Sequence, residues 1–223
     1  MACAVASPVP QLDGSQYRSV NCGPTVAAMA LRHATCDRLT PTPGEVRARG
    51  NMGTGPTGLG DLKRGVAAFA PDAAALGYDA PRLIKLGYIN ADQVRAQLVK
   101  KTAFMIIAVS YKILQRDEWQ AYRSDDYTGG HFICARKLFK RRSDGTFRRV
   151  RPYQLRRMRP ATLANLWTLV LDPLADNRRR WIPQAPQYWP MRLFLEAGDA
   201  FNDMSRDGKL LAAVIFQAAR LPT

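Results

Sequence analysis

The sequence predicts an α+β fold, in which helices come first and an antiparallel sheet follows. Up to about residue 101, apolar residues recur at the spacing of one helix face, between breaks rich in proline and glycine. From Thr102 onward, short apolar runs rich in β-branched residues are separated by turn signals, a pattern typical of strands. Helical and strand segments that follow one another in this way indicate the α+β class.

Helices are expected in four segments, of which the second is a single turn: 23–33, 45–49, 57–69 and 91–101. A glycine-rich stretch, 50–60, lies between the second and third of these. It lacks the Gly-Lys-Ser/Thr ending of a phosphate-binding loop, and no apolar strand precedes it, so nucleotide binding is not expected.

Strands are expected in four apolar segments: 104–109, 131–139, 146–150 and 166–171. The first is a continuous apolar run, as found in strands that are buried on both faces of a sheet. The turn signal at 143–145 joins the second and third strands as a hairpin. Near its end the chain is expected to hold an irregular segment with Trp181 and Trp189, and then an apolar helix over 209–220 that packs against the domain or a partner.

A chain of 223 residues can bury a full hydrophobic core. We expect one domain over 1–180, with a basic insertion at about 136–160, and a C-terminal extension over 181–223. No run of about twenty apolar residues is present and the first ten residues do not resemble a signal peptide, so neither a membrane span nor secretion is expected. The four cysteines lack paired short spacings, which predicts a reducing, cytoplasmic location without a disulfide framework.

The formal net charge of +15 is concentrated in one part of the chain. The segment 136–159 holds eleven arginines and lysines and a single acid, Asp144, and three further arginines follow at 178–180. As a solvated hairpin this segment would only contribute solubility. Because Tyr153 lies among arginines that lack compensating acids, contact with nucleic-acid phosphates or an acidic protein is the other interpretation, with four candidate docking residues. These are Arg148, Arg149, Arg156 and Arg157.

Cys22 is the candidate nucleophile. Pro24 suits the first turn of the helix that follows, which places the thiol where free backbone N–H groups and the helix dipole lower a thiol pKa. Six residues upstream, Gln16 carries an amide that could stabilise an oxyanion. The alternative is that Cys22 is one more buried cysteine with no chemistry of its own.

The chain has only two histidines that could serve as a base. His33 lies on the same expected helix as Cys22, roughly 16 Å away along its axis, so it cannot reach the thiol. His131 opens an apolar strand directly after two glycines, which allow another backbone or a substrate to approach closely. His131 is therefore the candidate base, and a solvent-facing histidine at a strand end is the alternative.

Gln16, the segment Asn21-Cys22-Gly23-Pro24-Thr25 and the later Gly-Gly-His before an apolar strand together resemble papain-like cysteine peptidases. Within them, the resemblance is greatest to the branch that processes bacteriocins with double-glycine leaders, and it covers roughly 11–176. It implies that a nucleophile helix packs on an antiparallel sheet that carries the catalytic His and Asp. It also implies Cys22 as the nucleophile, Gln16 in the oxyanion hole and His131 as the base.

Asp172 is the expected third catalytic residue, because it ends an apolar strand in an Asp-Pro step that is also common in the resembled family. The basic stretch between His131 and Asp172 departs from the family's single tight hairpin. Asp125, Asp126 and Asp176 therefore stay open as alternatives, and Asp172 could instead be a turn-forming residue.

The function expected from these residues is hydrolysis of a peptide or amide bond in a peptide or protein substrate, without a cofactor. One alternative is acyl transfer or isopeptide exchange at the same site. Another is a catalytically silent docking protein, associated with a virion if the chain is phage-encoded. His33 and Cys36 could present two metal ligands, but no second ligand pair accompanies them, so a metal site is not expected.

Overall fold

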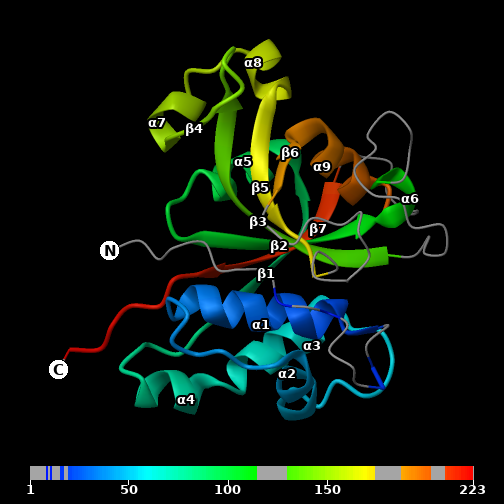
Figure 1. The fold of residues 1–223 in the computed structure, drawn as a ribbon, viewed down its shortest axis with the longest axis vertical. Coiled ribbons are helices and arrows are strands. Elements are labelled where there is room, and N and C mark those ends of the chain that lie inside the picture. Colours follow the sequence, from blue (N-terminus) through cyan, green and yellow to red (C-terminus); the bar gives the residue numbers. More distant parts are fainter. Residues whose placement is uncertain are drawn as a thin grey trace.

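The computed structural model describes residues 9, 11, 16–17, 20–114, 130–173, 187–201 and 209–222. Its central feature is a seven-stranded sheet in which every pair of neighbouring strands is antiparallel (Figure 1). The strands are β1 (Leu83–Asn90), β2 (Ala103–Ser110), β3 (Gly130–Arg141), β4 (Phe147–Arg149), β5 (Leu166–Leu171), β6 (Gln187–Pro190) and β7 (Lys209–Phe216). Their order is β1-β7-β2-β3-β5-β6, with β4 paired to β3.

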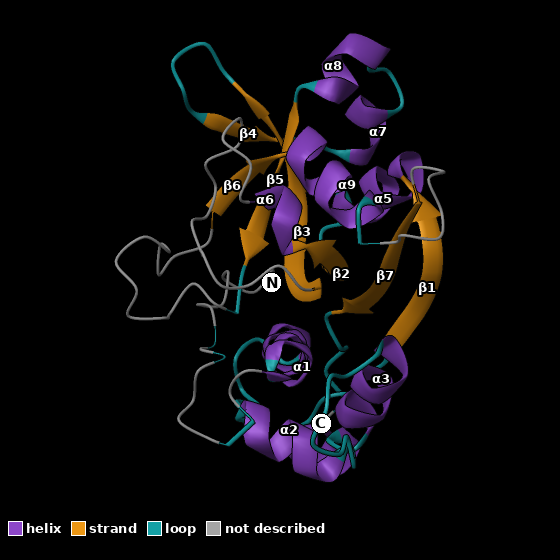
Figure 2. Ribbon diagram, turned by 90° about the vertical axis from the view of Figure 1, so that its right-hand side faces the viewer, coloured by secondary structure: helices purple, strands orange, loops and turns teal. Residues whose placement is uncertain are grey.

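Helices cover both faces of this sheet (Figure 1, Figure 2). One layer contains α1 (Cys22–Ala34), α2 (Pro43–Arg49), α3 (Leu59–Ala67) and α4 (Ala70–Ala75). The other face carries α5 (Ala91–Leu98) and α9 (Met191–Asp199). Three short helices complete the described elements: α6 (Tyr111–Leu114), α7 (Pro152–Leu155) and α8 (Pro160–Ala164).

The core lies on both sides of the sheet because β2 is apolar at successive positions. Met105 and Ile107 pack into the cluster with α5 and α9, whereas Phe104 and Ile106 pack into the cluster with α1, α2 and α3. Side chains alternate between the two faces of a strand, so a continuous apolar run suits a strand between two helical layers.

The α+β class is confirmed. All four expected helical segments contain a helix in the structure, and all four expected strand segments contain a strand, with ends that differ by a few residues. The hairpin turn at 143–145 is present: the N–H of Gly145 donates to the carbonyl of Arg142, and the N–H of Thr146 donates to the Asp144 carboxylate.

The helix expected over 209–220 is wrong. Lys209–Phe216 is the strand β7, which lies between β1 and β2, so this segment belongs to the sheet and is not a peripheral extension. Its apolar run is eight residues long and is buried between two helical layers, and periodicity alone does not separate such a run from a buried helix.

Two further parts of the structure were not expected. The strand β1 has an irregular pattern because its register shifts between Lys85 and Gly87, and Gly87 has a positive φ of 68°. The segment expected to be irregular around Trp189 contains β6 and the helix α9. Its other tryptophan, Trp181, lies outside the described residues.

The basic insertion expected at 136–160 extends the sheet beyond its central strands. It continues β3 to Arg141, returns through β4 and ends in α7 and α8, at the opposite end of the molecule from α2 and α4 (Figure 1). A register shift between Arg136 and Leu138, with Lys137 at a φ of 64°, bends β3 where this extension begins.

The cysteines correct one expectation. Cys36 is disulfide-bonded, whereas Cys22 and Cys134 are free thiols. Because disulfides persist mainly in oxidising environments, cysteine usage no longer supports a reducing compartment. Among the residues that the structure describes, no helix has both the length and the apolar character needed to cross a membrane.

Candidate active site

Cys22 is the first residue of α1, and α1 is fixed along nearly its whole length. Eleven of its thirteen residues are buried between the sheet on one side and α2 and α3 on the other. Alanines at 27, 28 and 30 allow these neighbours to approach closely. A helix that is apolar on all sides is stable only inside a core, so the thiol at its N-terminus has a defined position.

Arg47 of α2 holds the chain just before the nucleophile. Its Nε donates to the side-chain oxygen of Asn21 at 2.9 Å, and its guanidinium also donates to the carbonyl of Val20 at 2.9 Å. The same guanidinium donates to the carbonyls of Gly53 at 2.7 Å and Gly55 at 3.2 Å. Only 4 % of Arg47 is exposed, so one buried cation joins the residues before Cys22 to the loop in front of α3. Sequence reasoning missed Arg47, because an isolated arginine on a short helix carries no signal.

His131 lies near the start of β3, opposite Val109 of β2. Its Nε2 lies 2.9 Å from the carboxylate of Asp172, and each of the two residues is only 2 % exposed. Asp172 directly follows β5, whose last residue, Leu171, pairs with Cys134 of β3. The antiparallel β3–β5 pair thus sets the distance between base and acid. The exposed imidazole expected of a strand end is not found, because His131 is enclosed between Asp172 and the start of α1.

The thiol and the imidazole shift each other's titration. Burial favours the neutral thiol, but a hydrogen bond and charge interaction with His131, and backbone hydrogen bonds at Phe132 and Gly23, leave the pKa of Cys22 below its usual 9.0. Burial also favours the neutral imidazole, but the charge and hydrogen bond of Asp172 and the contact with Cys22 raise the pKa of His131 from 6.5 to about 9. At neutral pH these directions favour a thiolate–imidazolium pair.

The two other described cysteine and histidine side chains behave differently. Burial, then the nearby Asp172 carboxylate, raise the pKa of the Cys134 thiol well above 9.0. Burial lowers the pKa of His33 to about 4, and its Nε2 lies 2.7 Å from the carbonyl of Thr102. Neither residue has the electrostatic environment of a reactive group.

A cavity of about 340 Å³ opens beside the thiol and the imidazole. Gly130 borders it because the Phe201 ring lies where a side chain would be: a Cβ on Gly130 would be 2.0 Å from a ring carbon. Residues from α1, β2, β3, β7 and the loop before α3 line the cavity: Val20, Cys22, Pro56, Thr57, Gly58, Ala108, Gly130, His131, Phe132, Phe201 and Leu211. A peptide segment that enters this cavity meets the thiol directly.

The other residues expected at the site lie apart from this cluster. Gln16 lies in an exposed turn and is not among the residues that line the cavity. The alternative acids Asp125, Asp126 and Asp176 lie outside the described residues. In the basic insertion, Arg148, Arg156 and Arg157 are exposed, and Arg149 is partly buried.

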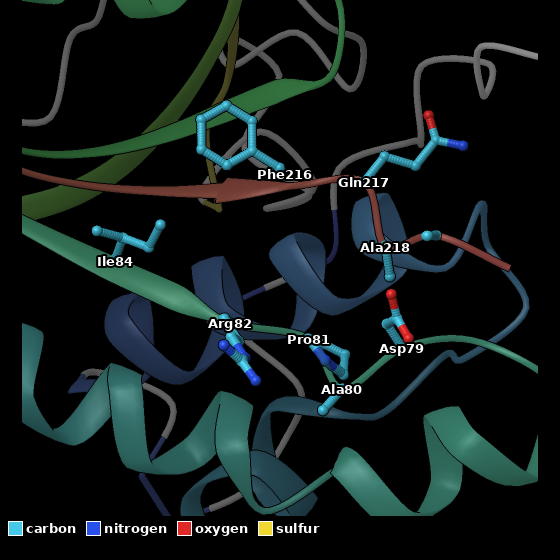
Figure 3. A pocket seen from close by; sticks show the side chains of 9 residues that line it. Asp79, Ala80, Pro81, Arg82, Ile84, Phe216, Gln217 and Ala218 are labelled. Carbon is cyan, nitrogen blue, oxygen red and sulfur yellow. The ribbon is translucent and has the colours of Figure 1, made fainter. Parts of the chain in front are cut away.

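A second cavity, of about 470 Å³, lies where β1 begins and β7 ends (Figure 3). Asp79, Arg82, Ile84, Phe216 and Gln217 line it together with four small apolar residues, and neither a thiol nor an imidazole is present. Among the described residues, no group of three or more His, Cys, Asp or Glu side chains could hold a metal ion. The Cys22 cavity is therefore the one that combines enclosed space with a nucleophile and a base.

The fold and the site define an α+β protein with a buried cysteine–histidine–aspartate cluster at the N-terminus of a helix. No family model matches the chain, and no curated protein sequence matches it.

Proposed function

We propose that this protein is a cysteine peptidase with a papain-like fold, in which Cys22 is the nucleophile, His131 the base and Asp172 the residue that orients the imidazole. The observation that carries this proposal is the contact of His131 with Cys22 on one side and with Asp172 on the other. The packing of a nucleophile helix on an antiparallel sheet that carries the other two residues supports the papain-like assignment. A histidine between a nucleophile and an orienting acid is the arrangement that unrelated hydrolases share.

The reaction begins from the thiolate–imidazolium pair. The thiolate attacks the peptide carbonyl carbon and forms a C–S bond, which moves an electron pair to the carbonyl oxygen. When the tetrahedral intermediate collapses, the C–N bond breaks and His131 gives its proton to the leaving amine. His131 then takes a proton from water, which attacks the thioester, releases the carboxylic acid and regenerates the thiolate. Acyl transfer would use the same first half, with an amine in place of water.

The basic insertion supports a second role, in docking to a polyanion or an acidic protein. Arg148, Arg156 and Arg157 are exposed and form no ion pair with a described carboxylate. Burial, and then the charge of Arg151, lower the pKa of Arg149, as expected where positive charges crowd together. Because this end of the molecule is remote from α2 and α4, docking here would localise the protein without occupying the Cys22 cavity.

The experiment that tests the peptidase proposal is mass spectrometry of the native protein after limiting iodoacetamide near neutral pH. Cys22 should be alkylated well before Cys134, which is fully buried and has a raised pKa. His131→Ala should slow the reaction of Cys22, and Cys22→Ala should abolish hydrolysis of any peptide substrate found in a peptide-library screen. If native Cys22 reacts no faster than a cysteine in the urea-unfolded chain, the thiolate argument is wrong.

A further inference from the structure

Thr57, which lies in the loop before α3, carries a polar group that the proposed triad does not use. Its hydroxyl oxygen is buried and forms no hydrogen bond with any described residue, yet Thr57 lines the same cavity as Cys22 and His131. Buried hydroxyl groups are nearly always hydrogen-bonded, since an unpaired one costs free energy. A hydroxyl that faces a cavity without a partner is available to a molecule bound there.

The position of this hydroxyl is fixed relative to the nucleophile by Gly23. A Cβ added to Gly23 would lie 1.8 Å from the Thr57 Oγ1 and 3.0 Å from a methyl carbon of Leu62. In a helix the Cα–Cβ bonds tilt toward the N-terminus, so the Thr57 oxygen lies toward the N-terminal end of α1, one residue from the thiol. The absence of a side chain at position 23 is what makes room for it.

The loop that carries Thr57 is anchored on both sides. Upstream, Arg47 donates to the carbonyls of Gly53 and Gly55. Downstream, the N–H of Gly58 donates to the Asp61 carboxylate at 2.7 Å, which caps α3. Arg47 also binds Val20 and Asn21, so the hydroxyl and the nucleophile share one anchor. Donors held in this way need no reorganisation during a reaction, which is the condition for strong electrostatic stabilisation.

We propose that Thr57 is a catalytic residue that donates its hydroxyl hydrogen to the oxyanion formed when Cys22 attacks a carbonyl group. This inference rests on the proposed function and assigns the side-chain donor for which the resemblance implies Gln16. Gln16 lies in an exposed turn and does not line the cavity, whereas Thr57 does. The hydroxyl gives a hydrogen bond and no proton is transferred, so the remaining steps of the reaction are unchanged.

Two reagents separate this role from any effect on the thiolate. Acylation by p-nitrophenyl acetate passes through a tetrahedral oxyanion, and stopped-flow release of p-nitrophenolate measures it. Alkylation by iodoacetamide is a displacement at a saturated carbon and forms no oxyanion. Thr57→Val keeps the shape of the side chain and removes the donor. It should lower the acylation rate constant by about 10²-fold, the loss typical of one oxyanion donor, and leave the alkylation rate constant within about twofold.

Thr57→Ser keeps the hydroxyl and should restore acylation to within a few-fold of the parent protein. Thr57→Ala removes the donor with less bulk and serves if the valine variant does not fold. An equal loss of acylation and alkylation in Thr57→Val, or unchanged acylation, would overturn the proposal. So would a selective loss of acylation in Gln16→Ala with none in Thr57→Val. If Cys22 of the parent protein reacts with neither reagent, the peptidase proposal itself fails.

Discussion

Replacing Gly23 by alanine tests the geometry at the mouth of α1 without any assumption about activity. The new Cβ would lie 1.8 Å from the Thr57 Oγ1, far inside van der Waals contact, and Leu62 closes the other side at 3.0 Å. Overpacking of this kind typically costs about 1–3 kcal/mol, because side chains and backbone must shift. For a chain of this length the thermal midpoint should fall by about 2–4 °C for each kcal/mol.

The clash has one principal cause, so a double-mutant cycle can isolate it. Thr57→Ala alone should change the free energy of unfolding by less than about 1 kcal/mol, since the hydroxyl has no partner to lose among the described residues. Combined with Gly23→Ala it should recover at least about 1 kcal/mol, as measured by urea unfolding. Thr57→Val is the matched control, since it keeps an atom at the same place and should give no recovery. Additive effects in the alanine cycle would refute the close approach of Gly23 and Thr57.

The remaining predictions concern the titration of the site and the basic insertion. Asp172→Asn should lower the pKa of His131 and so raise that of Cys22, because it removes the carboxylate that opposes burial of the imidazolium. Alkylation of Cys22 should then slow at pH 6 by about tenfold for each unit of that rise and recover above pH 9; an unchanged pH profile would contradict the coupling. Glutamine at four arginines should leave alkylation intact and, by anisotropy, reduce the salt slope of single-stranded DNA binding by about 0.7 for each phosphate that is no longer neutralised: Arg148, Arg149, Arg156 and Arg157. A control with the same reduction of charge elsewhere should keep the slope, and equal slopes in both variants would show that the insertion is only solvated surface: Lys63, Arg82, Lys85 and Lys101.

Local patterns were sufficient for the parts of the fold that combine a clear period with clear boundaries. The helix that begins at Cys22 and the strand β2 were both expected from the sequence, and both lie in the core. The residues of the candidate site were also chosen from the sequence, since two histidines leave few choices for a base. The structure brings Cys22, His131 and Asp172 together, although forty residues of chain separate the last two.

The features that sequence reasoning missed depend on tertiary contacts. The burial of Lys209–Phe216 between β1 and β2 turns an ambiguous apolar run into a strand, and nothing in the run itself specifies those neighbours. Thr57 becomes relevant only because α3 packs against α1, which places its hydroxyl beside Gly23. Arg47 likewise gains its role from two backbone segments that its own sequence context does not indicate.

The place of β7 has a consequence for the order in which a growing chain acquires the site. Synthesis proceeds from the N-terminus, so the segment that forms α1 emerges early and β7 emerges last. Until then β1 lacks its strand partner and β2 has an open edge, and pairing between segments so distant in sequence is intrinsically slow. Leu211 of β7 also lines the Cys22 cavity. The wall of that cavity is therefore completed only when translation of the strand has finished, which keeps the thiol of a nascent chain from working before the fold around it has closed.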